Sequence, residues 1–223
     1  MLSKNDLQFL EDLKANNNRD WFLANKKQYE EFKKDYHQLI AEFLEVMKPQ
    51  DANLEMLQIK NCTFRINRDI RFSKDKSLYK SHMGIWMNTN PSGQNAPGYY
   101  IHIEKGKSFI AGGLYSPEAP DLKKIRKEIA FFYDDLEEIV NEKKFKKYFD
   151  GLDRSETNSL KNAPKGFEKN DPAIEFLKLK SFTASHKIDD KELLDKNFVK
   201  TAAEKLIALK PLIDFLNRGL AAD

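Results

Sequence analysis

The chain has 223 residues, of which 40% are hydrophobic and 12% aromatic. This is enough apolar material for a folded core, so the composition excludes an intrinsically disordered protein. The formal net charge of +3 is too small for the field of the whole chain to indicate a nucleic-acid binder.

A single cysteine, Cys62, leaves no partner for an intramolecular disulfide and favours a cytoplasmic location. No apolar run approaches the roughly 20 residues that span a membrane, so no membrane association is predicted. Cys62 itself is expected to be a buried, inert thiol rather than a nucleophile, because it alternates with apolar neighbours.

The first fifty residues predict two helices. Ser3 and Asp6 resemble a capping box at the start of the first helix, and three asparagines at 16–18 end it. Asp20 is expected to cap a longer second helix, in which apolar residues recur with a period near 3.6. Pro49 ends that helix, because proline cannot continue the backbone hydrogen bonding.

Residues from about 60 to 115 predict an antiparallel sheet of three or four strands. The run "CTFRI" at 62–66 alternates, "GIWMN" at 84–88 is short and apolar, and residues 97–117 give the clearest hairpin in the chain. The polar run 88–98 is expected to be a mobile loop between strands.

The remainder returns to helices, with one late strand. Helices are expected from Ser116 onward, over 142–150, after Pro172, and from about Lys196 to Leu216, where Pro211 interrupts. The run 177–186 reads as a strand. This order predicts a single α+β domain over residues 1–223, with N- and C-terminal helices on an antiparallel sheet from the central segment and the late strand. Two packed subdomains remain an alternative.

Several well-defined motifs are absent from the sequence. There is no phosphate-binding P-loop, dinucleotide fingerprint, nucleophile elbow or zinc-binding H-E-x-x-H. The histidines are far apart in sequence and no pair has ligand spacing, so no metal site is predicted and no cofactor is identified. They are His37, His82, His102 and His186.

The predicted hairpin carries one candidate pair. His102 and Glu104 lie two residues apart on an expected strand, so their side chains are neighbours on one face together with Tyr100. They are either an acid–base pair or part of an ordinary exposed strand face.

The most unusual stretch is "RINRDIRFSKDKSLYKSH", residues 65–82, which we call the basic segment. It contains six Lys or Arg and two Asp, a net charge of +4, so the rest of the chain sums to −1. Apolar residues are interspersed between these charges, a pattern typical neither of a solvated loop nor of a core. The positive excess of the chain is therefore local to this segment.

In the preferred interpretation, the basic segment supplies a pocket for a phosphate- or carboxylate-bearing small molecule. Arg grips two oxygens at once and Lys adds a point charge. The predicted ligand-binding residues are Arg65, Asn67, Arg71, Lys74, Lys76, Tyr79, Lys80 and His82. Outer candidates are Arg19, beside a helix start, and Lys165, in a later loop.

Two alternatives remain open. One is a patch for nucleic-acid phosphates, less favoured because the rest of the chain is not basic. The other is an interaction module in which pairs such as Arg68 with Asp69 only fix a tight loop. The sequence leaves open whether the chain is an enzyme. If it is, His82 or His102 is the candidate proton carrier in hydrolysis or transfer on a phosphorylated small molecule. The sequence gives no oligomeric state.

Five ordered motifs resemble a known family. They are "NNNRDWF", "FRINRDIRFSKDKSLYKSH", "PGYYIHIE", "FIAGGLYSPE" and "PKGFEKNDPAIEFLKLKSF". Together they span nearly the whole chain and are similar to the widespread, mainly bacterial domain-of-unknown-function family numbered 2461. The resemblance implies an α+β protein of about this length and assigns no catalytic residues. The chain departs from the family pattern at Leu78, where the pattern has Pro, and at Ser81, where it has Thr.

Overall fold

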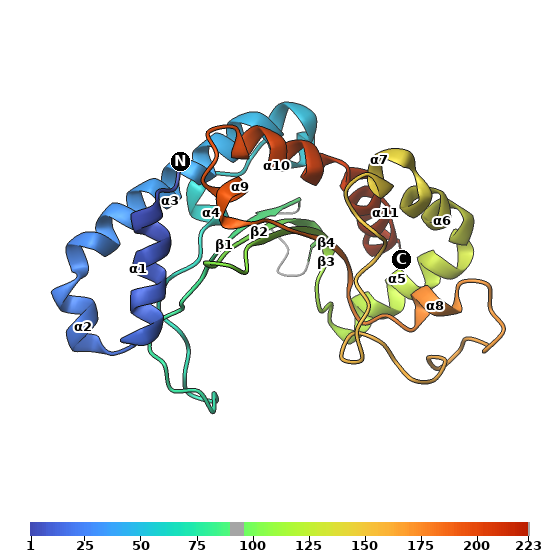
Figure 1. The fold of residues 1–223 in the computed structure, drawn as a ribbon. Coiled ribbons are helices and arrows are strands. Elements are labelled where there is room, and N and C mark those ends of the chain that lie inside the picture. The colour runs from blue at the N-terminus through green and yellow to red at the C-terminus, as the bar shows by residue number, and fades with distance from the viewer. Residues whose placement is uncertain (90–95, 223) are drawn as a thin grey trace. The chain divides into compact units, whose positions relative to one another are not determined.

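The computed structural model describes residues 1–89 and 96–222. It is 49% helical and 13% strand, with a four-stranded antiparallel sheet in the order β1-β2-β3-β4, which confirms the predicted α+β class (Figure 1). Much of the loop predicted at 88–98 lies outside the described residues. The strands are β1 (Met83–Asn88), β2 (Gly98–Ile103), β3 (Phe109–Leu114) and β4 (Phe182–Lys187).

Contacts divide the chain into two compact units. Unit 1 comprises Met1–Met87, Tyr100–Ile110 and Lys187–Ala203. Unit 2 comprises Asn88–Tyr99, Ala111–His186 and Glu204–Asp223. The single domain expected from the sequence stays a prediction, and each unit is described by itself.

Unit 1 contains helices of two kinds. The longer ones are α1 (Lys4–Ala15), α3 (Lys26–Met47) and the start of α10 (Phe198–Ile207). The short ones are α2 (Arg19–Ala24), the 3₁₀ turns η1 (Lys48–Gln50) and η2 (Ala52–Leu54), α4 (Ile59–Cys62) and α9 (Asp190–Leu193).

The first helix begins as predicted, whereas the second does not. The backbone N–H of Asp6 donates to Ser3 Oγ at 3.3 Å, and the Asp6 carboxylate accepts from the Ser3 backbone, which confirms the capping box. Asp20 caps nothing, because Asn18 takes that position and accepts from the Trp21 backbone. The predicted long helix breaks at Asn25, whose side chain donates to a carbonyl of the preceding turn.

Helix α3 carries the apolar stripe that its period predicts. Its buried residues are Phe32, Tyr36, Leu39, Ile40, Phe43, Leu44 and Met47. It ends at Met47, and Pro49 lies in the 3₁₀ turn that follows, as expected. The Tyr36 hydroxyl donates to the Gly84 carbonyl at 2.5 Å, so this stripe is tied directly to β1.

The strand predicted at 62–66 is wrong. Cys62 ends the short helix α4, which Gln58 and Asn61 cap reciprocally, and only Thr63 pairs in extended form, with Ile85. Phe64 is 36% exposed rather than buried. Cys62 is buried as predicted, and burial raises the pKa of its thiol to about 11.

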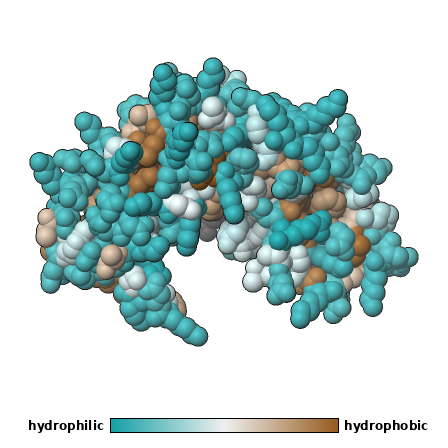
Figure 2. Space-filling model, in the orientation of Figure 1, coloured by the Kyte–Doolittle hydropathy of each residue, from teal (hydrophilic) through white to brown (hydrophobic). Residues whose placement is uncertain are grey.

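The helices of unit 2 follow the predicted order with shifted ends. They are α5 (Ala119–Phe131), α6 (Tyr133–Asn141), α7 (Lys143–Lys146), α8 (Ile174–Leu177) and α11 (Lys210–Ala221). Helix α5 begins after Glu118, not at Ser116, and has Pro120 in its first turn. Pro211 separates α10 from α11 by starting the second helix, which confirms the predicted interruption. Hydrophilic side chains cover most of the face in Figure 2, as 33% charged residues would suggest.

A substitution at Gly113 tests how closely β3 approaches β4. Its φ is +124°, and a Cβ atom there would lie 2.0 Å from the Phe182 carbonyl oxygen. We expect Gly113→Ala to lower the free energy of unfolding by about 3 kcal/mol or more, or to prevent folding. Urea unfolding followed by circular dichroism measures this.

The matched control is Gly106→Ala. Gly106 also has a positive φ, +71°, but a Cβ atom at this position would meet nothing within 4 Å, so only backbone strain of about 1 kcal/mol is expected. Equal losses in the two variants would contradict the close β3–β4 approach.

Candidate functional site

The basic segment folds back on itself as a two-stranded ribbon within unit 1. Arg68 N–H donates to the Leu78 carbonyl at 2.9 Å, and Lys80 N–H donates to the Ile66 carbonyl at 2.8 Å. Between these bonds, Asn67 and Tyr79 face each other as an antiparallel bridge. In Figure 1 the segment is the narrow teal loop that extends out from the body of unit 1.

Asn17 holds the base of this ribbon. Since Asn67 and Tyr79 form a non-hydrogen-bonded pair, the backbone polar groups of Tyr79 point outward. The Asn17 amide meets both of them, accepting from the Tyr79 N–H and donating to its carbonyl, each at 2.9 Å. The Tyr79 ring is 7% exposed and stacks on Phe22 at 4.1 Å between ring centroids. Tyr79 therefore anchors the ribbon, and its predicted ligand role stays a prediction.

Two of the six cations are paired inside the segment. Arg71 contacts Asp69 at 2.7 Å, and Arg68 forms an ion pair with Asp75. Hydrogen bonds from Ser77, followed by the Arg68 contact, lower the pKa of Asp75 to about 2. These ion pairs lie at the turn of the ribbon, but the predicted pairing of Arg68 with Asp69 is wrong, because Arg68 pairs with Asp75 and Asp69 pairs with Arg71.

Four cations remain without such a partner. Among the described residues, no ion pair with a carboxylate involves Arg65, Lys74, Lys76 or Lys80. Lys76 Nζ donates to the Ile70 carbonyl at 3.0 Å, and Lys80 Nζ lies 5.1 Å from the ring centroid of Phe64. Burial, and then the charge of Arg65, lower the pKa of Lys80. The net charge of +4 is thus carried by side chains along the ribbon.

The outer candidates are both exposed. Arg19 is exposed at the first position of α2, where Asn18 already caps the helix. Lys165 is exposed in unit 2, whereas the basic segment belongs to unit 1. Their part in a common site stays a prediction.

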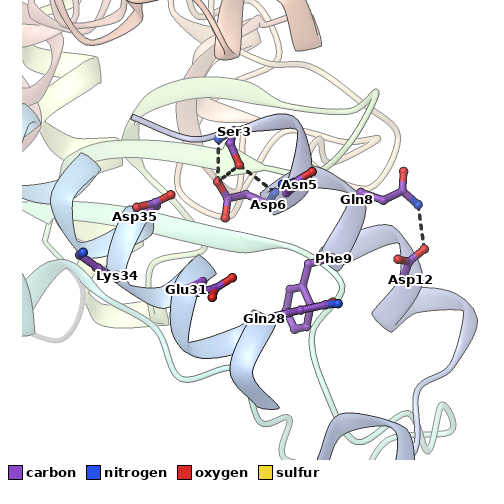
Figure 3. A pocket seen from close by; sticks show the side chains of 10 residues that line it. All are labelled: Ser3, Asn5, Asp6, Gln8, Phe9, Asp12, Gln28, Glu31, Lys34 and Asp35. Carbon is purple, nitrogen blue, oxygen red and sulfur yellow. Dashed lines mark hydrogen bonds between the residues drawn. The ribbon is translucent and has the colours of Figure 1, made fainter. Parts of the chain in front are cut away.

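The sequence predicts that basic side chains converge on a pocket, and the described pockets of unit 1 give this no support. The pocket in Figure 3, of about 600 Å³, lies between α1 and α3. It is lined by four carboxylates and a single Lys34, so its charge disfavours an anion. Two further pockets, beside α3 and α4, also include no residue of 65–82.

A second group of side chains lies where the ribbon meets the sheet. On β2, Tyr100 Oη lies 3.1 Å from His102 Nδ1, and His102 Nε2 lies 3.2 Å from Glu104 Oε2. The predicted adjacency of His102 and Glu104 is therefore confirmed. The residues Tyr99, Ile101 and Ile103, which alternate with them, are at most 1% exposed.

His82 joins this group, which the sequence did not indicate. Its ring centroid lies 4.6 Å from that of His102. His82 immediately precedes β1, and β1 pairs with β2 in antiparallel fashion, so the start of β1 lies beside the end of β2. The strand pairing was the signal that could have located it.

Electrostatics favour a neutral His82 and an ionised Glu104. Burial and the neighbouring His102 lower the pKa of His82, with Glu104 acting in the opposite direction. Burial acts to raise the pKa of Glu104, but the His102 hydrogen bond and the charge of Lys14 bring it below its ordinary value. Lys14 Nζ lies 3.5 Å from the Glu104 carboxylate.

Comparison with known families gives one match. The family described as conserved hypothetical protein, DUF2461, matches residues 5–215, nearly the whole chain. The chain belongs to the DUF2461 family. No curated protein and no solved structure matches this DUF2461 chain. In the part of the chain that the structure describes, no helix combines the length and apolar character needed to cross a membrane.

The anchoring role of Asn17 is testable. We expect Asn17→Ala to lower the free energy of unfolding by about 1–3 kcal/mol, because two partly buried backbone groups of Tyr79 lose their partner. Hydrogen exchange at the Tyr79 amide should also accelerate. Asn5→Ala on exposed α1 surface is the control and should change neither quantity appreciably. Unchanged exchange at Tyr79 in Asn17→Ala would contradict the role given to Asn17.

Proposed function

We propose that the basic segment binds phosphate groups, and that the ligand it fits best is nucleic acid. The observation that carries the proposal is the net charge of +4 on an exposed ribbon, four of whose cations have no carboxylate partner among the described residues. Nucleic-acid phosphates attract such groups largely irrespective of base sequence.

The arrangement of the cations favours a polymer. Arg65 and Lys80 lie at the base of the ribbon, while Lys74 and Lys76 lie near its turn. A small-molecule site is a concavity that surrounds its ligand, whereas a nucleic-acid backbone presents charges in series. Charges distributed along a ribbon match the second pattern.

An aromatic side chain at the turn adds to this match. Phe72 is 96% exposed, and the Arg71 guanidinium lies 5.9 Å from its ring centroid. Exposed aromatic rings beside cations provide stacking surfaces for the unpaired bases of single strands. Single-stranded nucleic acid is therefore the form that the segment suits best.

A phosphorylated small molecule is the second candidate. At the base of the ribbon, the charge of Arg65 lowers the pKa of Lys80, and that of Lys80 lowers the pKa of His82, so positive charge gathers around these groups. A cytoplasmic location, which the single buried cysteine favours, would expose the protein to both ligand classes.

Charge reversal at the turn tests the proposal. Fluorescence anisotropy with a labelled mixed-sequence single-stranded oligonucleotide should show binding whose log K falls with log salt at a slope of about −3, for four phosphate contacts. Lys74→Glu with Lys76→Glu should weaken binding and flatten that slope by about half. Lys143→Glu with Lys144→Glu, an equal charge change on exposed α7, should leave binding unchanged.

Failure to bind at low salt would overturn the nucleic-acid form of the proposal. Thermal shifts with ATP and inorganic phosphate then decide the small-molecule form. If both fail, and if Arg65→Ala and Arg71→Ala each greatly lower Tm, the segment is a structural part of an interaction module.

Phe72 gives an independent prediction. Phe72→Ala should weaken oligonucleotide binding by about 1–3 kcal/mol without changing the salt slope, because stacking is lost while phosphate contacts stay. Phe131→Ala removes another exposed ring, 80% exposed on α5, and should have no effect on binding. Equal effects of the two substitutions would count against stacking by Phe72.

A further inference from the structure

We propose that His82, His102 and Glu104 form a binding site for a divalent transition-metal ion of the Zn²⁺ type. The inference is independent of the basic segment's ligand. It concerns the neighbouring pair His102 and Glu104 and a histidine distant in sequence, His82, which the β1–β2 pairing brings beside them. The sequence predicts no metal site for that reason.

The distances suit a common ion. One ligand atom from each of the three residues lies within 4.8 Å of the other two. An ion about 2.1 Å from each ligand holds those ligands roughly 3.0–3.5 Å apart. His102 Nε2 and Glu104 Oε2 already have that separation, 3.2 Å, and the ligand atom of His82, within 4.8 Å, moves closer when the ion binds.

Neighbouring side chains orient His102 as a ligand. Metal-bound histidines usually hydrogen-bond through their second ring nitrogen, which fixes the tautomer. Here the Tyr100 hydroxyl lies 3.1 Å from Nδ1, leaving Nε2 directed toward Glu104. The Phe109 ring stacks on the imidazole at 4.7 Å, with 15° between the planes. The ring is thus held from its edge and its face.

The donor set selects the class of metal. Two imidazole nitrogens and a carboxylate are typical of zinc and of iron(II), whereas Mg²⁺ and Ca²⁺ prefer oxygen ligands alone. Three protein ligands leave a coordination position open.

Lys14 contacts the Glu104 oxygen that does not face His102, since Lys14 pairs with Oε1 and His102 Nε2 lies beside Oε2. Its ammonium lies 3.5 Å from Glu104, and its side chain is 47% exposed. A pair of this length with an exposed lysine is weak, so it competes little with an ion bound at Oε2.

Metal titration of the full chain, stripped with a chelator, tests the site. We expect saturable uptake of Zn²⁺, and of Co²⁺ with visible absorption bands of nitrogen and oxygen ligation. His82→Gln, His102→Gln and Glu104→Gln should each abolish this uptake. Tyr100→Phe should weaken it about 10- to 100-fold by freeing the His102 ring. His37→Gln, on α3 outside the group, is the control and should bind as the wild type does.

Each outcome decides the proposal. Circular dichroism shows whether each variant is folded. If a histidine variant does not fold, Glu104→Gln, which keeps the shape of the side chain, provides the comparison with the wild type. The proposal is overturned if the wild type takes up no more metal than folded Glu104→Gln does. It is also overturned if His37→Gln loses as much metal uptake as the variants of the three ligands. Oligonucleotide binding is measured without metal, so its failure leaves this result unaffected.

Discussion

The alternation of side chains along β2 is the constraint on which both functional features depend. Tyr99, Ile101 and Ile103 are almost fully buried, so the intervening residues are directed to the opposite face. A shift of register by one residue would bury His102 and expose the apolar set. Burial of the apolar residues therefore fixes where Tyr100, His102 and Glu104 lie. Since β1 pairs with β2, the same register also positions His82 and, through it, the base of the basic segment.

The basic segment contains two sets of side chains. Its ion pairs at Arg68–Asp75 and Arg71–Asp69 shape the turn, while Tyr79 and Asn17 attach its base to the helical part of unit 1. The remaining cations are left for other contacts. The structural and the ligand-binding interpretations of the segment are therefore not exclusive, because they concern different side chains of the ribbon.

The sequence predicted correctly those features that depend on a local pattern of residues. The hairpin of β2 and β3, the apolar stripe of α3, the late strand β4 and the adjacency of His102 and Glu104 all follow from periods of two or 3.6 residues. The errors occurred where side chains compete with the backbone. Asn18 took the capping position predicted for Asp20, Asn25 divided the predicted helix, and Gln58 with Asn61 capped a helical turn at the start of a predicted strand. The place of His82 depended on strand pairing, which no local pattern contains.

The amide of Asn17 has a consequence beyond anchoring. It occupies the outward-facing N–H and carbonyl of Tyr79 in the way that a neighbouring strand would. An unoccupied ribbon edge is a template on which a strand from another chain can add, and natural proteins block such edges. The Asn17 side chain blocks these two backbone groups of Tyr79 while the rest of the ribbon stays extended. The chain therefore presents a long exposed segment with one fewer backbone position at which another copy could pair.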